Sequence, residues 1–264
     1  MRGTVPLACL LLAGCGRQSI VSPRSPQTHD IATLWWWMLA VAGVVFFGAV
    51  GMLVLAWMRR EKPGLPHFGT REVVPQTLVL IFGIAIPAVV LVALFGVSNI
   101  YLVKQTAPPD ARTTALTVDV IGHQWWWEIR YGNPAHPGAV TANEIHIPVD
   151  TRVNVVATTA DVIHSFWVPQ LARKIDEVPG RQNRILLYAD RPGSYRGQCA
   201  EFCGLQHANM ALYVIAQPAP AFRTWLSDVS APAPRPVAGP ALAGEHLFMA
   251  DQCASCHTIR GTAA

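Results

Sequence analysis

QCAEFCGLQHANM, residues 198–210, brings four potential metal ligands together in one short stretch of the chain. The ligands are two thiols, an imidazole and a thioether, in the spacing Cys199-x-x-x-Cys203-x-x-x-His207-x-x-Met210. Thiolate and thioether donors favour copper, whereas imidazole suits copper or zinc. This stretch therefore predicts a metal site, and the rest of the chain is interpreted around it.

His164, far upstream in DVIHSFWVP, supplies a second imidazole. Val162 and Ile163 before it read as the end of a strand. Blue-copper sites use one Cys, two His and a weak axial Met, and this set has one Cys more. Two thiolates can bridge two copper ions, with one imidazole terminating each ion and Met210 as a weak axial ligand. A Cys199–Cys203 disulfide and a Cys/His zinc site are the alternatives, and Met210 and the distant His164 count against both.

The segment resembles the copper A loop of cytochrome c oxidase subunit II. The resemblance implies a dinuclear copper centre with five side-chain ligands, which are His164, Cys199, Cys203, His207 and Met210. It also implies that Glu201 is a backbone-carbonyl ligand. The Glu201 carboxylate would turn to a magnesium or similar ion at the interface with subunit I.

The composition argues against a wholly soluble protein, because 52% of the residues are hydrophobic and only 14% are charged. The net charge of +4 is modest. Much of it lies in short basic segments, so it does not indicate a nucleic-acid partner. The six cysteines fall into three pairs, near the start, in the metal stretch and near the end. No pair is left over that demands a structural disulfide.

The first residues have the pattern of an export signal. Residues 1–14 combine a basic start with a short apolar run and end in small residues, too short to span a bilayer. The LAGC ending resembles a bacterial lipoprotein box, which implies cleavage before Cys15 and lipid on its thiol. An uncleaved signal with an ordinary cysteine is the alternative. Residues 15–30, rich in Pro, Ser and Gln, are expected to form a polar tether.

Two long uncharged stretches predict a transmembrane helical hairpin over residues 31–101. Each is longer than the roughly 20 apolar residues that a membrane helix needs, and we expect helices at about 33–58 and 75–101. Tryptophans crowd the start of the first stretch, as in an aromatic belt, and a basic cluster at residues 59–62 follows its end. The positive-inside rule places that end in the cytoplasm. We therefore expect both termini on the periplasmic side of a bacterial cytoplasmic membrane, with a kink at Pro87.

Glu72 stands at the expected cytoplasmic mouth of the second helix. In the family that the chain resembles, a glutamate near this point marks the start of a proton channel of subunit I. The family's following Trp-Thr is replaced here by Pro75 and Gln76. A solvated carboxylate at a helix N-terminus is the alternative.

Residues 107–217 consist of short β-rich runs separated by turn signals; examples of the runs are LTVDVIG, EIHIPVD and ALYVIA. This pattern favours an antiparallel sandwich or barrel. With the candidate ligands on a late loop between strands, we expect an all-β, cupredoxin-like Greek-key barrel. Strand spacing alone would not separate it from an immunoglobulin-like sandwich.

Three consecutive tryptophans occur in GHQWWWE, residues 122–128. On a strand they face alternate sides, so at least one is exposed unless a partner covers it. The family resemblance implies that electrons enter from cytochrome c at Trp125 and that Trp127 packs near the copper. The family usually has Tyr where Trp126 stands. Ordinary core and interface packing is the alternative.

A second segment, LARKIDEVPGR, also resembles the family. It implies that Asp176 and Arg181 lie at a polar interface with subunit I, near its haem propionates; a solvated charged loop is the alternative. The acidic and basic side chains of the β-rich domain nearly balance, so electrostatic steering of a separate donor would be weak. That balance fits a donor tethered to the same chain.

The C-terminal part supplies such a donor. Residues 218–240 alternate Pro and Ala in places and read as a semi-stiff linker, in which residues 222–226 are expected to add a helical turn that closes the β-rich domain. Residues 241–264 read as the start of an all-α cytochrome c domain, in which Cys253, Cys256 and His257 form the C-x-x-C-H pattern of covalent haem attachment. A redox dithiol or part of a zinc site is the alternative. Because the sequence stops at Ala264, soon after this motif, we expect a fragment or a vestigial domain.

Together these features predict subunit II of a cytochrome c-fused, caa-type haem–copper oxidase. Electrons would pass from haem c to dinuclear copper A and on to haem in subunit I, where oxygen is reduced and protons are pumped. The chain would not turn over alone, and subunits I and III would be its partners. A quinol oxidase subunit lacks these copper ligands, and nitrous oxide reductase lacks the hairpin. A membrane-anchored copper chaperone or periplasmic redox sensor is the alternative of a different class.

Overall fold

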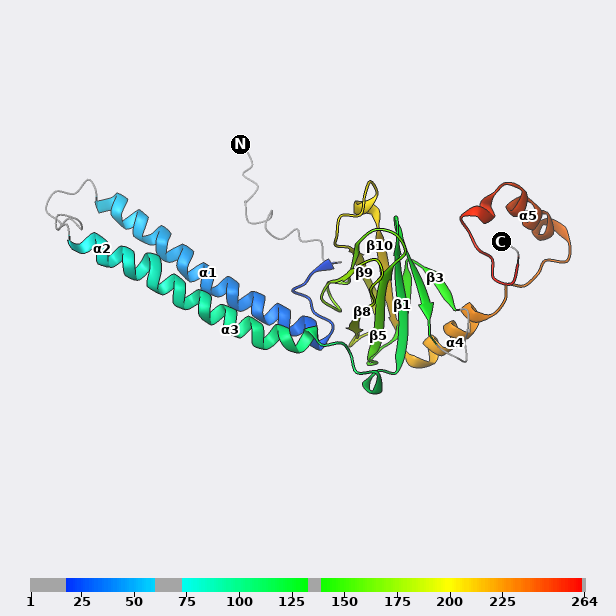
Figure 1. Cartoon of the computed structure of the whole chain (residues 1–264), viewed down its shortest axis with the longest axis horizontal. Coiled ribbons are helices and arrows are strands. Elements are labelled where there is room, and N and C mark those ends of the chain that lie inside the picture. The colour runs from blue at the N-terminus through cyan, green and yellow to red at the C-terminus, as the bar shows by residue number, and fades with distance from the viewer. Residues whose placement is uncertain (1–17, 60–72, 133–138, 263–264) are drawn as a thin grey trace, which may run out of the picture.

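The computed structural model describes residues 18–59, 73–132 and 139–262. Three parts follow one another along the long axis in Figure 1: a helical hairpin, a β-sandwich and a small C-terminal helical segment. Cys15 and Glu72, singled out above, lie outside the described residues.

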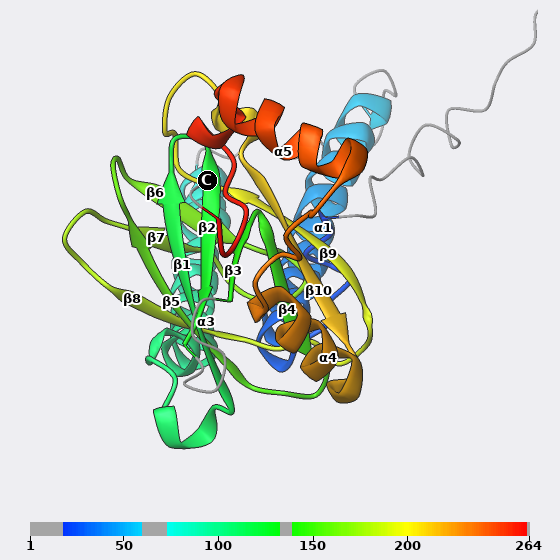
Figure 2. The same ribbon diagram turned by 90° about the vertical axis from the view of Figure 1, so that its right-hand side faces the viewer.

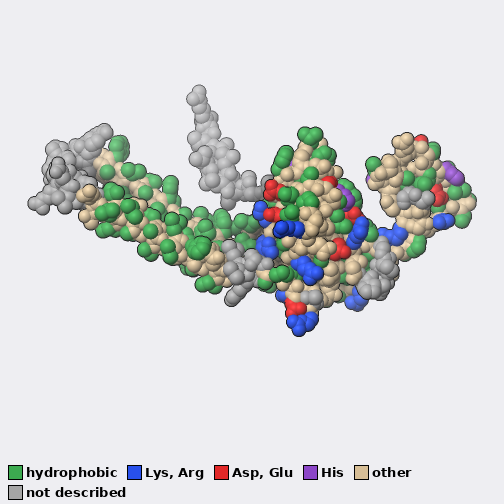
Figure 3. All heavy atoms as spheres, viewed as in Figure 1, with side chains coloured by type: hydrophobic (Ala, Val, Ile, Leu, Met, Phe, Trp, Pro, Cys, Tyr) green, Lys and Arg blue, Asp and Glu red, His purple; other side chains and the backbone are tan. Residues whose placement is uncertain are grey.

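The hairpin consists of α1 (Pro26–Arg59) packed beside a second long helical run. That run comprises α2 (Val73–Leu80), the π-helical turn η3 (Ile81–Ala85) and α3 (Ile86–Thr106). Two spans, Pro26–Met58 and Gln76–Ile100, are long and apolar enough to cross a membrane, and their most apolar stretches are not buried inside the protein. Hydrophobic side chains cover this surface (Figure 3), while charged side chains gather on the sandwich. The hairpin therefore fits a two-pass membrane protein.

The second helix is irregular where proline was expected to disturb it. The Ile86 amide donates to the Ile81 carbonyl, five residues back, directly before Pro87. Proline has no amide hydrogen and its ring clashes with the preceding turn. A single π turn accommodates that disturbance without ending the helix.

The β-rich region forms two five-stranded sheets that face each other. One has the order β3-β2-β1-β5-β8 and the other the order β4-β10-β9-β6-β7. A short 3-10 turn, η4 (Ala111–Thr113), precedes them. The strands are β1 (Leu116–His123), β2 (Trp126–Tyr131), β3 (Val140–Ala142), β4 (Glu144–Pro148), β5 (Val153–Thr159), β6 (His164–Trp167), β7 (Ile175–Glu177), β8 (Asn183–Leu187), β9 (Gly193–Cys199) and β10 (Ala211–Gln217).

Most neighbouring strands in the sandwich are antiparallel, and the pairs β1–β5 and β4–β10 are parallel. Alternation along the strands builds the core: in β1, Val118 and Val120 are fully buried while their neighbours are half-buried. Side chains of both sheets fill the space between them. The architecture is cupredoxin-like, as expected, and takes the form of a sandwich of two open sheets.

Helix α4 (Ala219–Ser230) closes one end of the sandwich against β4 (Figure 2). Phe222 and Leu226, one helical turn apart, reach the core, and the Trp225 ring stacks on the His146 ring at 3.8 Å. Within the expected linker of residues 218–240, a single helical turn closing the domain was expected at residues 222–226, and the structure extends it to twelve residues. The helix forms because its apolar residues recur at helical spacing and find a partner surface, so an extended link begins only after Ser230.

Residues 18–25 also differ from the polar tether expected for 15–30. The Arg24 amide donates to the Gln170 carbonyl at 2.8 Å, and the Arg24 carbonyl accepts from the Asp190 amide at 3.0 Å. Thr28 in the first turn of α1 donates to the same Gln170 carbonyl at 2.9 Å. The segment before the hairpin is thus fastened to two loops of the sandwich.

The C-terminal segment contains α5 (Gly239–Ala250) and the 3-10 turn η6 (Cys253–Ser255). The chain then returns toward the sandwich, where Arg260 donates to the backbone carbonyls of Ala231 at 3.4 Å and Val140 at 3.3 Å. These contacts place the segment next to the edge strand β3, on the opposite side of the sandwich from the hairpin (Figure 1).

Candidate metal centre

Strand pairing brings His164 to the loop that carries the other candidate ligands. His164 begins β6, Cys199 ends β9, and these neighbouring strands pair Phe166 with Cys199. The chain from Cys199 to β10 then holds Cys203, the 3-10 turn η5 (His207–Asn209) and Met210. Residues distant in sequence thereby meet at one end of the second sheet.

The ligand atoms form one continuous group. The His164 Nδ1 lies 3.8 Å from Cys199 Sγ, and the two Sγ atoms are 3.9 Å apart. On the other side, Cys203 Sγ lies 3.6 Å from His207 Nδ1 and 3.7 Å from Met210 Sδ. One imidazole therefore stands beside each thiol, with the thioether beside Cys203.

The Glu201 carbonyl joins this group through its backbone, because Cys199 Sγ donates to it at 3.2 Å. The Glu201 side chain itself is exposed. The two polar groups of this residue thus lie in different environments, with the carbonyl turned to the thiols and the carboxylate exposed at the surface.

The candidate ligands are enclosed by the protein, and the two cysteines do not form a disulfide. His164, Cys199, Cys203 and Met210 are buried, and His207 is half-buried. Both cysteines are free, and their sulfurs are far beyond the roughly 2.05 Å of a disulfide bond. The donor set is soft, with two thiols and a thioether beside two imidazoles, so the residues fit copper better than zinc.

Asp161 fixes the tautomer of His164. Its Oδ1 lies 2.8 Å from His164 Nε2, and a carboxylate can only accept, so the proton resides on Nε2. Nδ1 is then left with its lone pair facing Cys199. Although burial opposes it, hydrogen bonds from His164 and two backbone amides hold the pKa of Asp161 below its usual value. Such a carboxylate–histidine pair orients a metal-binding imidazole.

The ligand loop is fastened by backbone hydrogen bonds. The Cys199 amide donates to the Met210 carbonyl and the Ala200 amide to the Ser165 carbonyl, both at 2.9 Å. Gly204 adopts φ +117°, a left-handed conformation that disfavours side chains, and a Cβ there would lie 3.2 Å from Gln124 and Trp125. These contacts fix the shape of the ligand loop at both of its ends and at Gly204.

The two thiols must lose their protons before they can bind a metal. Burial, together with the neighbouring Cys199 thiol, raises the pKa of Cys203 to about 12. The thiolate is the form that binds metal, so an incoming ion must displace protons from the pair.

The three tryptophans take three different environments. Trp125 is half-buried and its Nε1 donates to the Cys203 carbonyl at 3.1 Å. Trp126 is 37% exposed and stacks on His123 with 4.5 Å between ring centroids. Trp127 is fully buried, with its ring centroid 6.1 Å from that of His164. Trp125 is thus the one whose indole nitrogen bonds to the backbone of a ligand residue.

Three residues of the site were not singled out from the sequence. Besides Asp161, Gln124 donates to the Cys203 carbonyl at 2.8 Å, and Glu177 pairs with His164 across β6 and β7. Burial, with the nearby Cys199 thiol adding to it, raises the pKa of Glu177 to about 10. The position of Asp161, three residues before a candidate ligand, was the available signal. Glu177 lies in the quoted segment LARKIDEVPGR, but nothing in that segment distinguished it from its charged neighbours.

The C-x-x-C-H motif lies apart from this group, in the segment beyond α4 (Figure 1). The Cys253 and Cys256 thiols are free and exposed, and the His257 side chain is exposed too. The His257 amide donates to the Cys253 carbonyl at 2.9 Å, so the motif forms a compact turn. All three side chains are accessible from one short segment.

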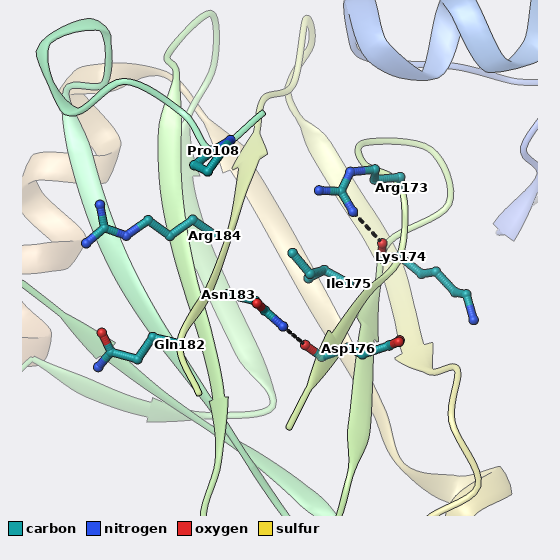
Figure 4. A pocket seen from close by; sticks show the side chains of 8 residues that line it. All are labelled: Pro108, Arg173, Lys174, Ile175, Asp176, Gln182, Asn183 and Arg184. Carbon is teal, nitrogen blue, oxygen red and sulfur yellow. Dashed lines mark hydrogen bonds between the residues drawn. The ribbon is translucent and has the colours of Figure 1, made fainter. Parts of the chain in front are cut away.

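A separate charged pocket of about 720 Å³ opens between β7 and β8 (Figure 4). Arg173, Lys174 and Arg184 line it, and Asp176 is exposed at its rim. The Asn183 side chain donates to the Asp176 carbonyl at 2.6 Å, which ties the two strands together. Arg181 is exposed in the turn between these strands. Asp176 therefore belongs to a largely cationic surface.

Soft donors of this kind on a cupredoxin-like sandwich define a copper-binding domain, here joined to a hairpin of two apolar helices. A family model, "Cytochrome C oxidase subunit II, periplasmic domain", matches residues 137–217. Cytochrome c oxidase subunit 2 of Alkalihalophilus pseudofirmus is 34% identical over 262 residues, which cover 96% of this chain and 75% of that protein. The Bacillus subtilis subunit is 30% identical over 274 residues, with 96% and 74% covered. The chain belongs to the cytochrome c oxidase subunit II family.

Among solved structures, the periplasmic domain of subunit II of cytochrome oxidase from Bradyrhizobium japonicum is 30% identical. The match covers 47% of this chain and 96% of that domain, with a TM-score of 0.43.

Proposed function

We propose that this chain is the electron-input subunit of a haem–copper terminal oxidase. It would accept electrons from a cytochrome c haem at a dinuclear copper A centre and pass them to haem in subunit I, where oxygen is reduced to water with proton pumping. The observation that carries the proposal is the continuous donor group, with one imidazole beside each of two neighbouring thiols. Membership of the family supports it.

The residues that would hold the copper are the two thiolates, Nδ1 of His164 and of His207, the Met210 thioether and the Glu201 carbonyl. When bound, the copper pair supplies a one-electron redox centre. The chain contributes a buried, fastened ligand loop, which limits how far the ligands move between redox states. Asp161 keeps the His164 lone pair directed into the group.

Burial favours this function over a copper chaperone. A chaperone needs an open site from which the ion can be exchanged. Here both thiols are at most 4% exposed and the ligands come from two separate loops. Rigid enclosure suits a resident cofactor.

Electron paramagnetic resonance (EPR) tests the proposal on the full chain, purified in detergent and loaded with copper. We expect two copper ions per chain and, in the oxidised protein, equal hyperfine coupling of one unpaired electron to two copper nuclei. Coupling to a single nucleus, or one copper per chain at saturation, would refute the dinuclear centre.

The C-x-x-C-H turn is proposed to bind haem c covalently through Cys253 and Cys256, with His257 as the iron ligand. The exposure of all three side chains from one turn supports this. We expect the full chain, produced in a host with cytochrome c maturation enzymes, to retain haem on a denaturing gel. The double variant Cys253→Ser/Cys256→Ser should lose the haem, whereas Cys199→Ser should keep it; haem retained by the double variant would exclude this attachment.

The remaining assignments follow from the same function. The hairpin would place the copper domain and both termini on the periplasmic side of the cytoplasmic membrane. Subunit I would cover the exposed Glu201 carboxylate, with magnesium between them, and the cationic surface beside Asp176; subunit III is a further partner. Lipid on Cys15 and a proton-channel role for Glu72 remain proposals from the sequence.

A further inference from the structure

Glu177 is a buried carboxyl group beside the candidate centre that the ligand set does not use. It ends β7, where it pairs with His164 of β6, and its side chain has no exposed surface. Neither carboxyl oxygen has a hydrogen-bond partner among the residues that the structure describes. Because a buried polar group without partners is costly, its presence next to a ligand calls for a physical explanation.

Gly122 provides the space for this carboxyl group. A Cβ at position 122 would lie 2.5 Å from Glu177 Oε2 and 2.7 Å from His164 Cδ2. The carboxyl and the edge of the imidazole therefore share the spot that a side chain on β1 would otherwise fill. Both distances are shorter than real Cβ contacts, so glycine is required for the two groups to lie there together.

The side of the His164 ring on which the carboxyl group lies determines which movement of the ring it can restrict. The His164 ring is attached to the chain at Cγ and held at Nε2 by Asp161, 2.8 Å away. It can still turn about the line of the Cβ–Cγ bond, which passes close to Nε2. Cδ2 lies on one side of that line and Nδ1 on the other, so a wall at Cδ2 also limits the movement of Nδ1. Trp127 packs near the same ring, with 6.1 Å between centroids.

We propose that Glu177 is a positioning residue for His164, whose carboxyl group supports the Cδ2 edge of the imidazole and so directs Nδ1 toward the metal beside Cys199. The proposal deepens the copper function and rests on it for its consequence at the metal. In this role Glu177 acts through the volume that its carboxyl group occupies beside Cδ2. The amide of glutamine has the same shape and should replace it.

Four versions of the full chain in detergent test this role: wild type, Glu177→Ala, Glu177→Gln and Leu187→Ala. Leu187 is fully buried in the other sheet, so its truncation leaves a cavity of comparable kind away from the ring. In the metal-free protein, ¹⁵N-histidine NMR should show exchange broadening of the His164 ring in Glu177→Ala alone. This first readout does not depend on copper, so it separates failure of the positioning role from failure of the proposed function.

In the copper-loaded protein, pulsed EPR should show a changed nitrogen coupling from one of the two histidines in Glu177→Ala. Copper should also leave this variant about tenfold faster, in a chelator competition, than it leaves Leu187→Ala. Glu177→Gln should match wild type in every readout. If Glu177→Ala and Leu187→Ala behave alike at His164, or if Glu177→Gln is as disturbed as Glu177→Ala, the positioning role is wrong. Should Glu177→Ala not fold, Glu177→Val keeps a strand-compatible side chain and carries the same test.

Discussion

Replacing Cys203 by serine is expected to destroy the dinuclear centre. Cys203 Sγ is the central atom of the donor group, within 3.9 Å of the Cys199 sulfur, the His207 nitrogen and the Met210 sulfur. A serine hydroxyl stays protonated at neutral pH and is a hard donor, so it cannot replace the thiolate that would bridge two copper ions. We expect at most one copper per chain, hyperfine coupling to one nucleus, and oxidase turnover reduced by roughly a hundredfold or more, about 2.7 kcal/mol of barrier.

The matched control for Cys203→Ser is Cys256→Ser, the same chemical change in the exposed C-terminal turn. It should leave the copper stoichiometry and the copper EPR signal of the chain unchanged. If Cys203→Ser keeps two equivalent copper nuclei, the assignment of the ligand loop is wrong. If both variants lose the signal, the loss reflects the production of the protein and the copper assignment loses its support.

Trp125→Phe is expected to slow the arrival of electrons while leaving copper in place. The indole donates to the Cys203 carbonyl at 3.1 Å, and this hydrogen bond joins the half-buried ring to the backbone of a ligand residue. Phenylalanine removes the bond and shortens the ring system that reaches toward the surface. Pre-steady-state reduction of the copper by cytochrome c should slow by roughly tenfold or more, about 1.4 kcal/mol of barrier. The EPR signal should stay that of wild type.

Trp126→Phe provides the comparison. Trp126 is adjacent, more exposed and stacked on His123, and among the residues that the structure describes its indole makes no hydrogen bond to the ligand loop. It should reduce the rate of copper reduction less than Trp125→Phe does. A larger effect at Trp126 would move the point where electrons enter to the stacked His123–Trp126 pair.

The candidate ligands could be predicted from the sequence because four of them lie within one loop. Their spacing from Cys199 to Met210 is local, so it identifies the site before any folding is known. The three tryptophans were also visible, but their alternation on a strand did not say which one bonds to the loop. That assignment depends on how closely the turn between β1 and β2 approaches the Cys203 carbonyl.

The packing of two segments was not predicted. The composition of a segment indicates how soluble and how stiff it is, but it does not say which surface the segment packs against. The polar residues 18–25 read as a tether, yet their backbone groups bond to the loops at Gln170 and Asp190. For the stretch that contains Phe222 and Leu226 only one helical turn was expected, because proline and alanine dominate its surroundings. Its apolar spacing nevertheless forms α4 once the end of the sandwich offers a surface.

The sequence by itself determined the two apolar helices, the β-rich domain, the candidate ligands and the C-x-x-C-H motif, because each depends on residue types at short spacing. Only the tertiary structure decided what surrounds the ligands. Asp161 meets Nε2 of His164, and the Glu177 carboxyl and the Cδ2 edge of the ring both lie against the space that Gly122 leaves open. These contacts join β1, β6 and β7, and strand pairing, which is non-local, sets which of their side chains share a face.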